Sequence, residues 1–425
     1  MAIESEVLVI GGGLAGATAA VSAARTGADV RLVSHKRSTL RSASGLIDVL
    51  GYTPDGEGPL VDPLAALSDL PDDHPYERVG RDAVEAGLAL FDDVVDSYEG
   101  NHTGRNALVP VQGGRVKPTA RYPASAAAGL ASDGRDALLV GFERLVGFDA
   151  PLSAARLNAA GVPFAARGVT VEFPADLSAD PKVTRFAHLL DRDAVGEDGP
   201  TGSVRRALAE RVATHLDGED RVGFPAVLGD DHPEAVRADL ESHLGAAVFE
   251  VPTGPPSLPG LRLEDRLYDA LDAAGVRIET GNPVVGYEAD ADGDRIEAVT
   301  VDRSGATVPY AAEQFVLATG GLVGKGIDSD REGVTEPIFD CHVAHPPDRY
   351  DWFADDAFGD HRFARFGVDP DRELRPRDAR GTVEFDNLRA AGSVLGNYDF
   401  AAEKSGGGVS LATGHHAGRL AGENT

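Results

Sequence analysis

The stretch "EVLVIGGGLAGATAAVSAARTGADVRLVSHK", residues 6–36, decides the fold of this chain. A short β-branched run stops at Gly11, and the small residues that start at Leu14 predict a tightly packing helix that ends at Gly27. Residues 30–33 then predict a second strand. A strand, a glycine turn, a helix and a strand within about thirty residues are the context in which a G-x-G-x-x-G motif indicates a nucleotide-binding unit.

Each glycine of the motif has its own physical reason. Gly11 permits the tight turn, Gly13 lets the backbone approach a phosphate, and Gly16 allows the helix to pack closely on the strand. The phosphate would lie at the amino end of the helix, where free N–H groups and the helix dipole are positive. A glycine-rich turn without a ligand is the alternative, and the flanking strands and helix argue against it.

The acidic residue that usually contacts the adenosine ribose is missing. In dinucleotide sites this residue stands at the end of the second strand. Here that strand leads into Ser34, His35 and Lys36, so NAD is disfavoured. Lys36 or Arg37 meeting a ribose phosphate, as in NADP sites, stays open, although such residues are more often solvated turn charges.

The charge balance excludes several classes of partner. Acidic residues outnumber Lys and Arg by 69 to 40, which gives a net charge of −29. Lysine occurs only at positions 36, 117, 182, 325 and 404, a depletion typical of proteins from a salt-rich cytoplasm. Molar salt shortens the Debye length to about 3 Å, so such a fold tolerates the repulsion between its own negative charges. Nucleic acid and anionic lipid surfaces are disfavoured as partners because phosphates need a basic footprint.

A single cysteine, Cys341, excludes an internal disulfide and a self-contained iron–sulfur cluster. The motifs "CHVAH" and "HH" match no recognised ligand spacing, so we expect no metal site. No run approaches the roughly 20 apolar residues of a membrane span, and the start lacks the order of a signal peptide. We therefore expect an intracellular chain with no direct membrane span.

The pattern in the middle of the chain indicates a domain inserted into the nucleotide-binding domain. Residues 53–75 are rich in Pro, Gly and Asp and predict an exposed connection. Beyond them, helices are predicted at residues 81–98, 152–160, 204–216 and 233–244, and strands at 137–140 and 169–173. The stretch "VPTGPPSLPG", residues 251–260, closes this region.

After the insertion, the pattern of helix, strand, hairpin and core strand, which ends in "FVLATGG" at residues 315–321, resembles the second half of a doubly wound domain. The fold class is therefore α/β: a doubly wound, Rossmann-like FAD/NAD(P)-binding fold with an inserted α+β cap domain. We expect residues 1–75, 257–330 and 376–425 to form the nucleotide-binding domain, and residues 76–256 and 331–375 to form the cap.

The carboxyl end carries a second glycine signal. A short strand ends at Gly392 and Ser393, and the three glycines of residues 406–408 open a helix rich in small residues. Bare N–H groups at such an opening would stabilise negative charge that develops on a bound ring. A flexible glycine hinge is the alternative.

Several stretches together resemble the B-subunit family of the anaerobic glycerol-3-phosphate dehydrogenases. They are "STLRSASGLIDVL" (residues 38–50), "VLATGGLVGKGI" (316–327), "REGVTEPIFD" (331–340) and, most specifically, "NLRAAGSVLGNYDF" with "GGGVSLATGHHAG" near the carboxyl end. The resemblance implies a flavoprotein that works beside two partners, a catalytic FAD subunit and a membrane-attached iron–sulfur subunit. Together these oxidise sn-glycerol 3-phosphate to dihydroxyacetone phosphate and pass electrons toward quinone.

The resemblance also implies a cofactor and its site. FMN is favoured because it has no adenosine to need the missing acid, and FAD is the alternative. The phosphate would bind at Gly11, Gly13 and Gly16, the ribityl chain near Gly392 and Ser393, and the ring edge at Gly407, Gly408 and Val409. The remaining expected cofactor contacts are Ser42, Ser44, Gly45 and Gly320.

No residue is assigned a catalytic role. Possible bases are His342, His345, His415 and His416, and possible phosphate clamps are Lys117, Arg121 and Arg156, but residues of these types are mostly structural or solvated. We predict a cytoplasmic flavin subunit that relays electrons between the catalytic flavin subunit and the iron–sulfur subunit. It reaches the inner face of the membrane through a partner and meets glycerol 3-phosphate via the complex. The alternatives are a self-sufficient flavin oxidoreductase that acts on another small acid, and a scaffold protein without flavin.

Overall fold

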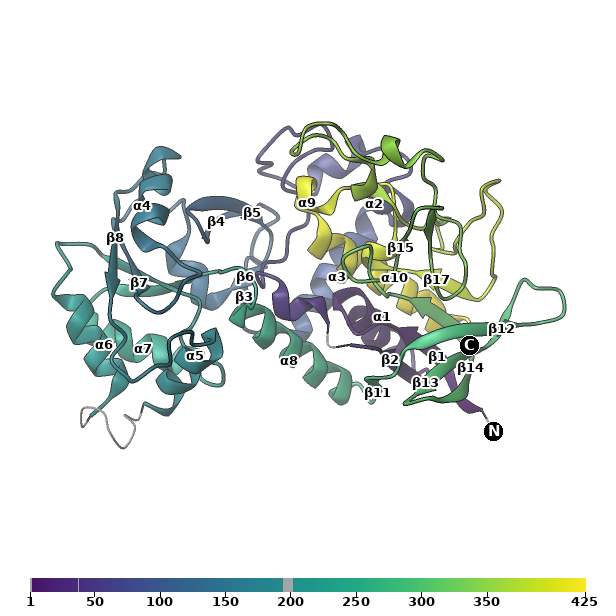
Figure 1. Ribbon diagram of the computed structural model, residues 1–425, viewed down its shortest axis with the longest axis horizontal. Coiled ribbons are helices and arrows are strands. Elements are labelled where there is room, and N and C mark those ends of the chain that lie inside the picture. Colours follow the sequence, from purple (N-terminus) through teal and green to yellow (C-terminus); the bar gives the residue numbers. More distant parts are fainter. Residues whose placement is uncertain (1, 37, 194–201) are drawn as a thin grey trace. The chain divides into compact units, whose positions relative to one another are not determined.

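The computed structural model describes residues 2–36, 38–193 and 202–425, and the chain divides into two compact units (Figure 1). The first unit contains Met1–Thr39, Ile47–Asp96 and Asp265–Thr425. The second contains Leu40–Leu46 and Ser97–Glu264. The chain therefore leaves the first unit twice, once for a short excursion and once for a long insertion.

These boundaries differ from those expected from the sequence. Residues 76–96 and 331–375, assigned to the cap, group with the nucleotide-binding unit, whereas residues 40–46 and 257–264, assigned to that unit, group with the second unit. The reason is tertiary packing. The 81–94 helix lies so close to the last helix that a Cβ on Gly87 would come within 2.7 Å of the backbone of Leu411. Val368 bridges to Leu395 and so ties the 331–375 segment to the carboxyl-terminal part of the chain.

The first unit is built on a seven-stranded sheet in the order β11-β2-β1-β14-β13-β12, with β17 also paired to β14. Strands β11, β2, β1, β14 and β17 run parallel, whereas β12, β13 and the start of β14 form antiparallel pairs. The strands are β1 (Ile3–Ile10), β2 (Val30–Ser34), β11 (Arg277–Thr280), β12 (Val284–Ala289), β13 (Ile296–Arg303), β14 (Ala306–Leu317) and β17 (Leu388–Ala390). The doubly wound expectation is confirmed.

Strand β14 changes partner along its length, and Asn387 bridges the change. The first half of β14 pairs with β13 and its end pairs with β17. The fully buried Asn387 amide donates to Ile296 O at 2.9 Å and Glu313 O at 3.0 Å, and its Oδ1 accepts the Ile296 N–H at 2.9 Å. One side chain thus satisfies backbone groups that the interrupted ladder leaves open.

Helices α1 (Leu14–Ala24) and α10 (Gly406–Glu423) lie side by side and cover the sheet, purple and yellow in Figure 1. Small residues let their backbones nearly touch: a Cβ on Gly418 would overlap the Ala19 carbonyl. Gly414 and Gly422 approach Ala15 and Ala23 in the same way, one turn to either side. This contact explains why both helices are rich in Gly and Ala.

The first unit also contains α2 (Pro75–Val79), α3 (Arg81–Val94), β15 (Asp328–Ser329), β16 (Val334–Thr335) and α9 (Phe400–Glu403). Helix α8 (Leu258–Ala273) includes residues of both units. The expected exposed connection at 53–75 is partly wrong, because Leu67, Leu70 and His74 are buried.

No helix within the part of the chain that the structure describes is long and apolar enough to cross a bilayer.

The second unit has a four-stranded parallel sheet in the order β10-β9-β7-β8, which is more regular than the α+β architecture expected. Phe142, Phe173 and Phe186 fill its core, with ring centroids 5.1–5.6 Å apart. Its helices are α4 (Ala150–Ala159), α5 (Val183–Arg192), α6 (Val204–Ala213) and α7 (Pro233–Leu244). Its strands are β7 (Ala137–Phe142), β8 (Ala166–Val171), β9 (Arg221–Pro225), β10 (Ala247–Val251) and the small pairs β3 (Tyr98–Glu99) with β6 (Tyr122–Pro123) and β4 (Ala107–Val111) with β5 (Arg115–Thr119).

Candidate cofactor site

Two glycines of the amino-terminal motif are required by chain packing. Gly11 has φ +119°, and its N–H donates to Val33 O at 2.8 Å. A Cβ on Gly11 would overlap the carbonyl of Ala318, and a Cβ on Gly16 would overlap the carbonyl of Gly11. The turn after β1 therefore fits tightly between β14 and α1, which is the geometry expected for these two positions.

Gly13 differs from both because the space beside it is open. No atom lies within 4 Å of the position that a Cβ on Gly13 would take. Gly13 is also the N-cap of α1, with φ −80° and ψ −173°, and no side chain caps this helix end. The first turn of α1 carries no acidic residue. The site thus combines a positive helix end with room for an anion.

The loop after β14 borders the glycine turn. The Ala318 N–H donates to Ile10 O at 2.8 Å, which holds the loop against the end of β1. Ser393 Oγ accepts the Gly321 N–H at 3.2 Å, so this loop and the 392–394 turn lie together. The buried Thr319 Oγ1 has no hydrogen-bond partner within the described residues. An unpartnered hydroxyl beside a glycine loop is what a polar ligand would satisfy.

Gly392 lies where β17 meets the two long helices. Its φ is +77°, its N–H donates to Thr413 Oγ1 at 2.9 Å, and a Cβ here would come within 2.6 Å of the Ala15 Cβ. Glycine is therefore required by packing at this point. The structure brings Gly11, Gly13, Gly320 and Gly392 to the same end of the parallel strands, with Gly16 and Ser393 among them.

The expectation of bare N–H groups at the start of α10 is wrong for Gly408 and Val409. The Gly408 N–H donates to Asp48 O at 2.6 Å, and the Val409 N–H donates to Ser405 O at 2.9 Å. A Cβ on Gly407 would lie 3.0 Å from Asp48 N, and one on Gly408 would lie 2.8 Å from the Val49 Cα. These glycines let the helix start pack on the backbone of residues 47–49.

A buried polar cluster that the sequence did not indicate supports this second helix start. His74 and Glu403, each 1% exposed, approach at 3.2 Å between Nε2 and Oε2. Because His74 Nδ1 accepts the Tyr76 N–H at 3.1 Å, its Nε2 carries the proton and donates to the carboxylate. The Ser405 hydroxyl donates to the same carboxylate at 2.9 Å.

Two tyrosines enclose the cluster. Burial, with smaller contributions from neighbouring negative charges, raises the pKa of Tyr76 and of Tyr398, so both phenols stay neutral. The Tyr76 hydroxyl donates to Val49 O at 2.5 Å. The only sequence signal for the cluster is a histidine and two aromatic residues close to Pro-rich and Gly-rich stretches, which is too common to predict it.

Ser42, Ser44 and Gly45 belong to the second unit. There Gly45 has φ +75°, and its carbonyl accepts the Tyr98 hydroxyl at 2.6 Å. Ser44 Oγ accepts the Leu46 N–H at 3.4 Å. These contacts are turn chemistry within that unit. A cofactor role for these three residues stays a prediction.

The turn that follows β2 is where the acid that contacts the adenosine ribose would stand. β2 ends at Ser34, whose hydroxyl donates to Lys36 O at 2.7 Å. Lys36 is exposed at this turn. Arg37, the other residue considered for a ribose phosphate, lies outside the described residues.

The side chains of three of the four histidines considered as bases have hydrogen-bond partners. His345 Nδ1 lies 2.7 Å from Val343 O, and His416 Nε2 lies 3.2 Å from Arg372 O. His415 Nδ1 lies 3.0 Å from the Ser22 hydroxyl. Burial, together with neighbouring arginines, lowers the pKa of His415 and of His416. Within residues 2–36, 38–193 and 202–425, no group of three or more His, Cys, Asp or Glu is arranged to hold a metal ion.

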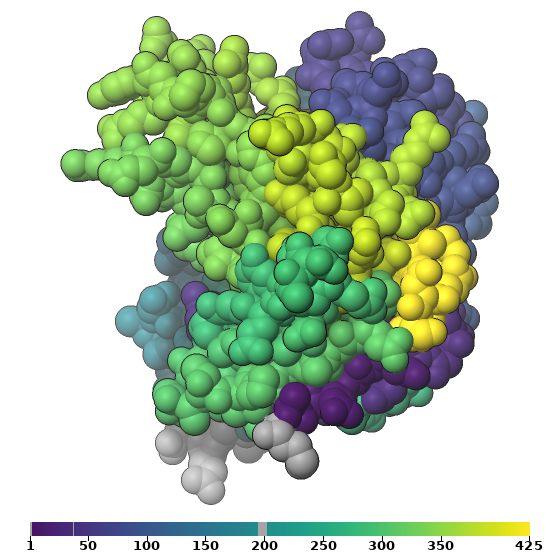
Figure 2. Space-filling view, turned by 90° about the vertical axis from the view of Figure 1, so that its right-hand side faces the viewer, coloured from purple at the N-terminus to yellow at the C-terminus, as the bar shows by residue number. Residues whose placement is uncertain are grey.

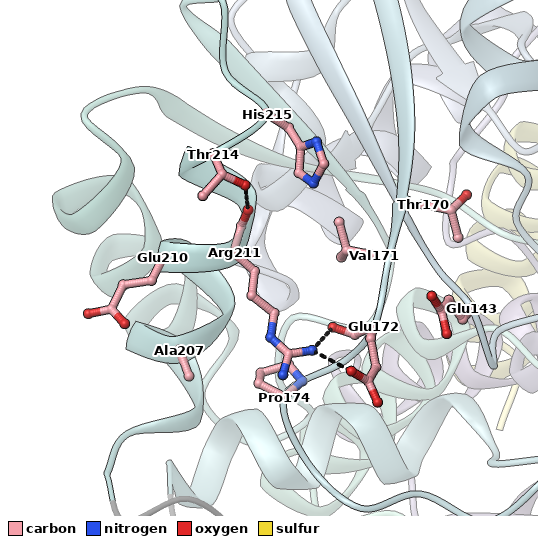
Figure 3. Close-up of a pocket in the computed structure, with 10 residues that line it drawn as sticks. All are labelled: Glu143, Thr170, Val171, Glu172, Pro174, Ala207, Glu210, Arg211, Thr214 and His215. Carbon is pink, nitrogen blue, oxygen red and sulfur yellow. Dashed lines mark hydrogen bonds and ion pairs between the residues drawn. The ribbon is translucent and has the colours of Figure 1, made fainter.

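The second unit carries an open hollow of about 610 Å³ beside β8 and α6 (Figure 3). Glu143, Glu172 and Glu210 line it, which makes it unfavourable for an anionic substrate. Arg211 also lines the hollow, but its Nη1 already donates to Glu172 O at 2.7 Å and lies 3.2 Å from Glu172 Oε2. The hollow therefore offers no free clamp for a phosphate.

The geometry of the first unit fits a nucleotide-type flavin cofactor. The open helix end at Gly13 suits the phosphates, and the loop after β14 adds the unpartnered Thr319 hydroxyl and a contact with Ser393. The family model described as "FAD binding domain" matches residues 6–409. By fold and site, the chain is an FAD-binding flavoprotein. FAD supplies reversible electron transfer on its isoalloxazine ring.

Relatives with known names show to which family of FAD-binding flavoproteins the chain belongs. A relative from Halobacterium salinarum, named as the probable B-subunit of an anaerobic glycerol-3-phosphate dehydrogenase, is 65% identical over 424 residues, which cover 100% of this chain and 99% of the relative. The B-subunit of the same name from Pectobacterium atrosepticum is 32% identical over 427 residues, 97% of each chain. The one from Vibrio cholerae is 31% identical, covering 97% of this chain and 95% of its own. The chain belongs to the B-subunit family of the anaerobic glycerol-3-phosphate dehydrogenases.

The comparisons confirm the family and the flavin. They also decide between the two flavins that the sequence left open, because the matching family model is that of an FAD binding domain. The cofactor is therefore FAD, the alternative to the FMN that the missing acid favours. The absence of an acid at the end of β2 does not exclude an adenosine-bearing cofactor in this fold.

Proposed function

We propose that this chain is the flavin-bearing relay subunit of an anaerobic glycerol-3-phosphate dehydrogenase complex. In this proposal it passes electrons from a catalytic FAD subunit to an iron–sulfur subunit, and quinone is the final acceptor. The observation that carries the proposal is the 65% identity to a relative named as the B-subunit of that enzyme, over essentially the whole length of both chains. The open helix end at Gly13 supports it, because a relay protein must hold its own flavin.

The side chains of the first unit also favour a relay over direct oxidation of an alcohol. Oxidation of a secondary alcohol needs a base for the hydroxyl proton and cations for the substrate phosphate. Three of the four candidate bases, His345, His415 and His416, bond to backbone or hydroxyl groups instead. The one cysteine, Cys341, is buried, and burial with nearby carboxylates raises the pKa of its thiol. It is unsuited to ligate a cluster, so any cluster belongs to a partner.

The proposed location is the cytoplasmic face of the cell membrane, which the chain reaches through the iron–sulfur subunit. A net charge of −29 makes direct adsorption to anionic lipid unfavourable. Attachment through a protein partner avoids this repulsion.

The test begins with the purified chain alone. We expect mass analysis of the released cofactor to give FAD, and the flavin band at about 450 nm to stay unbleached when glycerol 3-phosphate is added. Addition of the catalytic FAD subunit should permit bleaching, and addition of the iron–sulfur subunit should permit reduction of a soluble quinone. Bleaching of the isolated chain would show a self-sufficient enzyme. A chain that contains no flavin would show a scaffold.

A further inference from the structure

An aromatic pocket of about 310 Å³ lies in the first unit. Its walls come from two short helical turns, Arg349–Trp352 and Arg362–Arg365, and from the loop that follows β14. Trp352, Phe353, Phe363 and Phe366 face it. The volume suits one small ring compound and is too small for a helix.

The walls of the pocket are held in place before any ligand arrives. Trp352 Nε1 donates to Pro346 O at 2.7 Å. The Trp352 ring meets the Phe366 ring edge-on, with centroids 5.7 Å apart and planes at 88°. The His345 ring packs against both at 5.8 and 6.0 Å. A ligand would therefore meet flat faces at fixed angles and would order few side chains on binding.

These aromatic rings are costly to leave exposed on so acidic a chain. Phe353 is 49% and Phe363 is 40% exposed. The segment that contains them belongs to the light-green part that projects at the upper left of the face in Figure 2. Phe358, in the same segment, is 98% exposed but does not line the pocket. Exposed rings that converge on a cavity indicate binding, whereas a single exposed ring needs no explanation.

One lysine completes the pocket. Lys325 lies on its rim in a left-handed conformation, with φ +65°, and makes no ion pair with any residue that the structure describes. Asp328 shares the rim, and its carboxylate accepts the Ser329 N–H at 2.9 Å. The rim therefore offers an ammonium donor without a large excess of positive charge. An ammonium beside aromatic walls suits an oxygen substituent on a flat ring.

We propose that this pocket binds a planar ring compound whose edge carries an acceptor oxygen, with the ring against Trp352 and Phe363 and the oxygen at Lys325. The pocket shares a loop with the cofactor site, so the proposal is tested on the flavin-loaded chain. Lys325 follows Gly320 and Gly321 in a single loop, and that loop contacts Ser393. The proposal concerns a second ligand and does not depend on the relay function.

The chain offers a built-in reporter, because Trp352 is its only tryptophan. The probe is 2-naphthoate, titrated into the full flavin-loaded chain, with binding followed by Trp352 emission and by calorimetry. The matched compound is decahydro-2-naphthoate, which keeps the carboxylate but is saturated and not flat. We expect saturable binding of 2-naphthoate and binding of the saturated compound that is weaker by about fivefold or more.

Matched variants test whether 2-naphthoate binds in this pocket. Phe363→Ala should weaken 2-naphthoate binding by about tenfold, and Phe358→Ala should leave it within about twofold. Lys325→Gln should weaken it by about fivefold, and the exposed Lys182→Gln should leave it unchanged. All four variants should keep their FAD. The proposal is overturned by non-saturating titration, by equal binding of the saturated compound, or by equal effects of Phe363→Ala and Phe358→Ala. FAD content tests the proposed function separately.

Discussion

Two glycine-bearing helix starts look alike in the sequence and differ in the fold. The start of α1 has open space beside Gly13 and no side-chain cap. The start of α10 is filled: Gly408 donates to Asp48 O, and a Cβ on Gly407 would lie 3.0 Å from Asp48 N. A glycine before a small-residue helix can thus serve a ligand or serve close packing of the chain on itself. The volume beside the missing Cβ decides between the two.

The largest effect is expected where glycine joins the two helices. Gly418→Val places a branched side chain where even a Cβ would overlap the Ala19 carbonyl, so α1 and α10 must separate. We expect loss of the folded first unit, measured as loss of cooperative thermal unfolding and of bound FAD together. Gly286→Ala on β12 is the control, because nothing lies within 4 Å of its Cβ position, and it should unfold like the wild type.

A smaller effect is expected at the cluster behind the α10 start. Glu403→Gln removes the charge that accepts from His74 and Ser405, and should lower the free energy of unfolding by about 2–4 kcal/mol. Glu423→Gln breaks an exposed pair with Arg419 and should cost less than about 0.5 kcal/mol. Denaturant titration measures both.

The Glu403 variant also sharpens the comparison of the two helix starts. If the start of α10 serves packing, the FAD affinity of the Glu403→Gln chain should change by less than about threefold. FAD loss at unchanged stability would instead make that helix start a binding element.

The smallest effect is expected in the dependence of stability on pH. His415 contacts Ser22 of α1 from α10, and burial, with Arg419, His416 and Arg25, lowers its pKa in the fold below the ordinary value of 6.5. The unfolded chain therefore binds the proton more readily than the folded chain. The contribution of His415 to stability is present above about pH 6.5 and is lost as the pH falls below it. His415→Asn should flatten the dependence of the melting temperature on pH between about 7 and 5, because the proton that His415 takes up on unfolding is then missing. An unchanged slope would contradict this role.

The sequence predicted features that depend on neighbouring residues. The roles of Gly11 and Gly16 and the bounds Pro233–Leu244 of α7 follow from local patterns of glycine, apolar and capping residues, and the structure agrees. What it missed depends on residues far apart in the chain. The contact of Gly408 with Asp48 and the pair of His74 with Glu403 each join segments more than 300 positions apart. Nothing in either segment alone indicates its partner.

The choice between FMN and FAD shows a second limit. The argument for FMN used one missing residue, the acid after β2, although a ribose can be contacted from elsewhere in the fold. The family model, which spans residues 6–409, weighs many positions at once and corrects the inference.

The most direct test of the contrast between the two helix starts is the FAD affinity of Gly13→Glu. The new side chain has room, because nothing lies within 4 Å of its Cβ and φ is −80°. It places a carboxylate at the helix end where the cofactor phosphates belong. We expect the dissociation constant of FAD to rise by at least about 100-fold, while the melting temperature of the flavin-free chain changes by less than about 3 °C. Retention of FAD at wild-type affinity would contradict the assignment of the α1 start as the cofactor site.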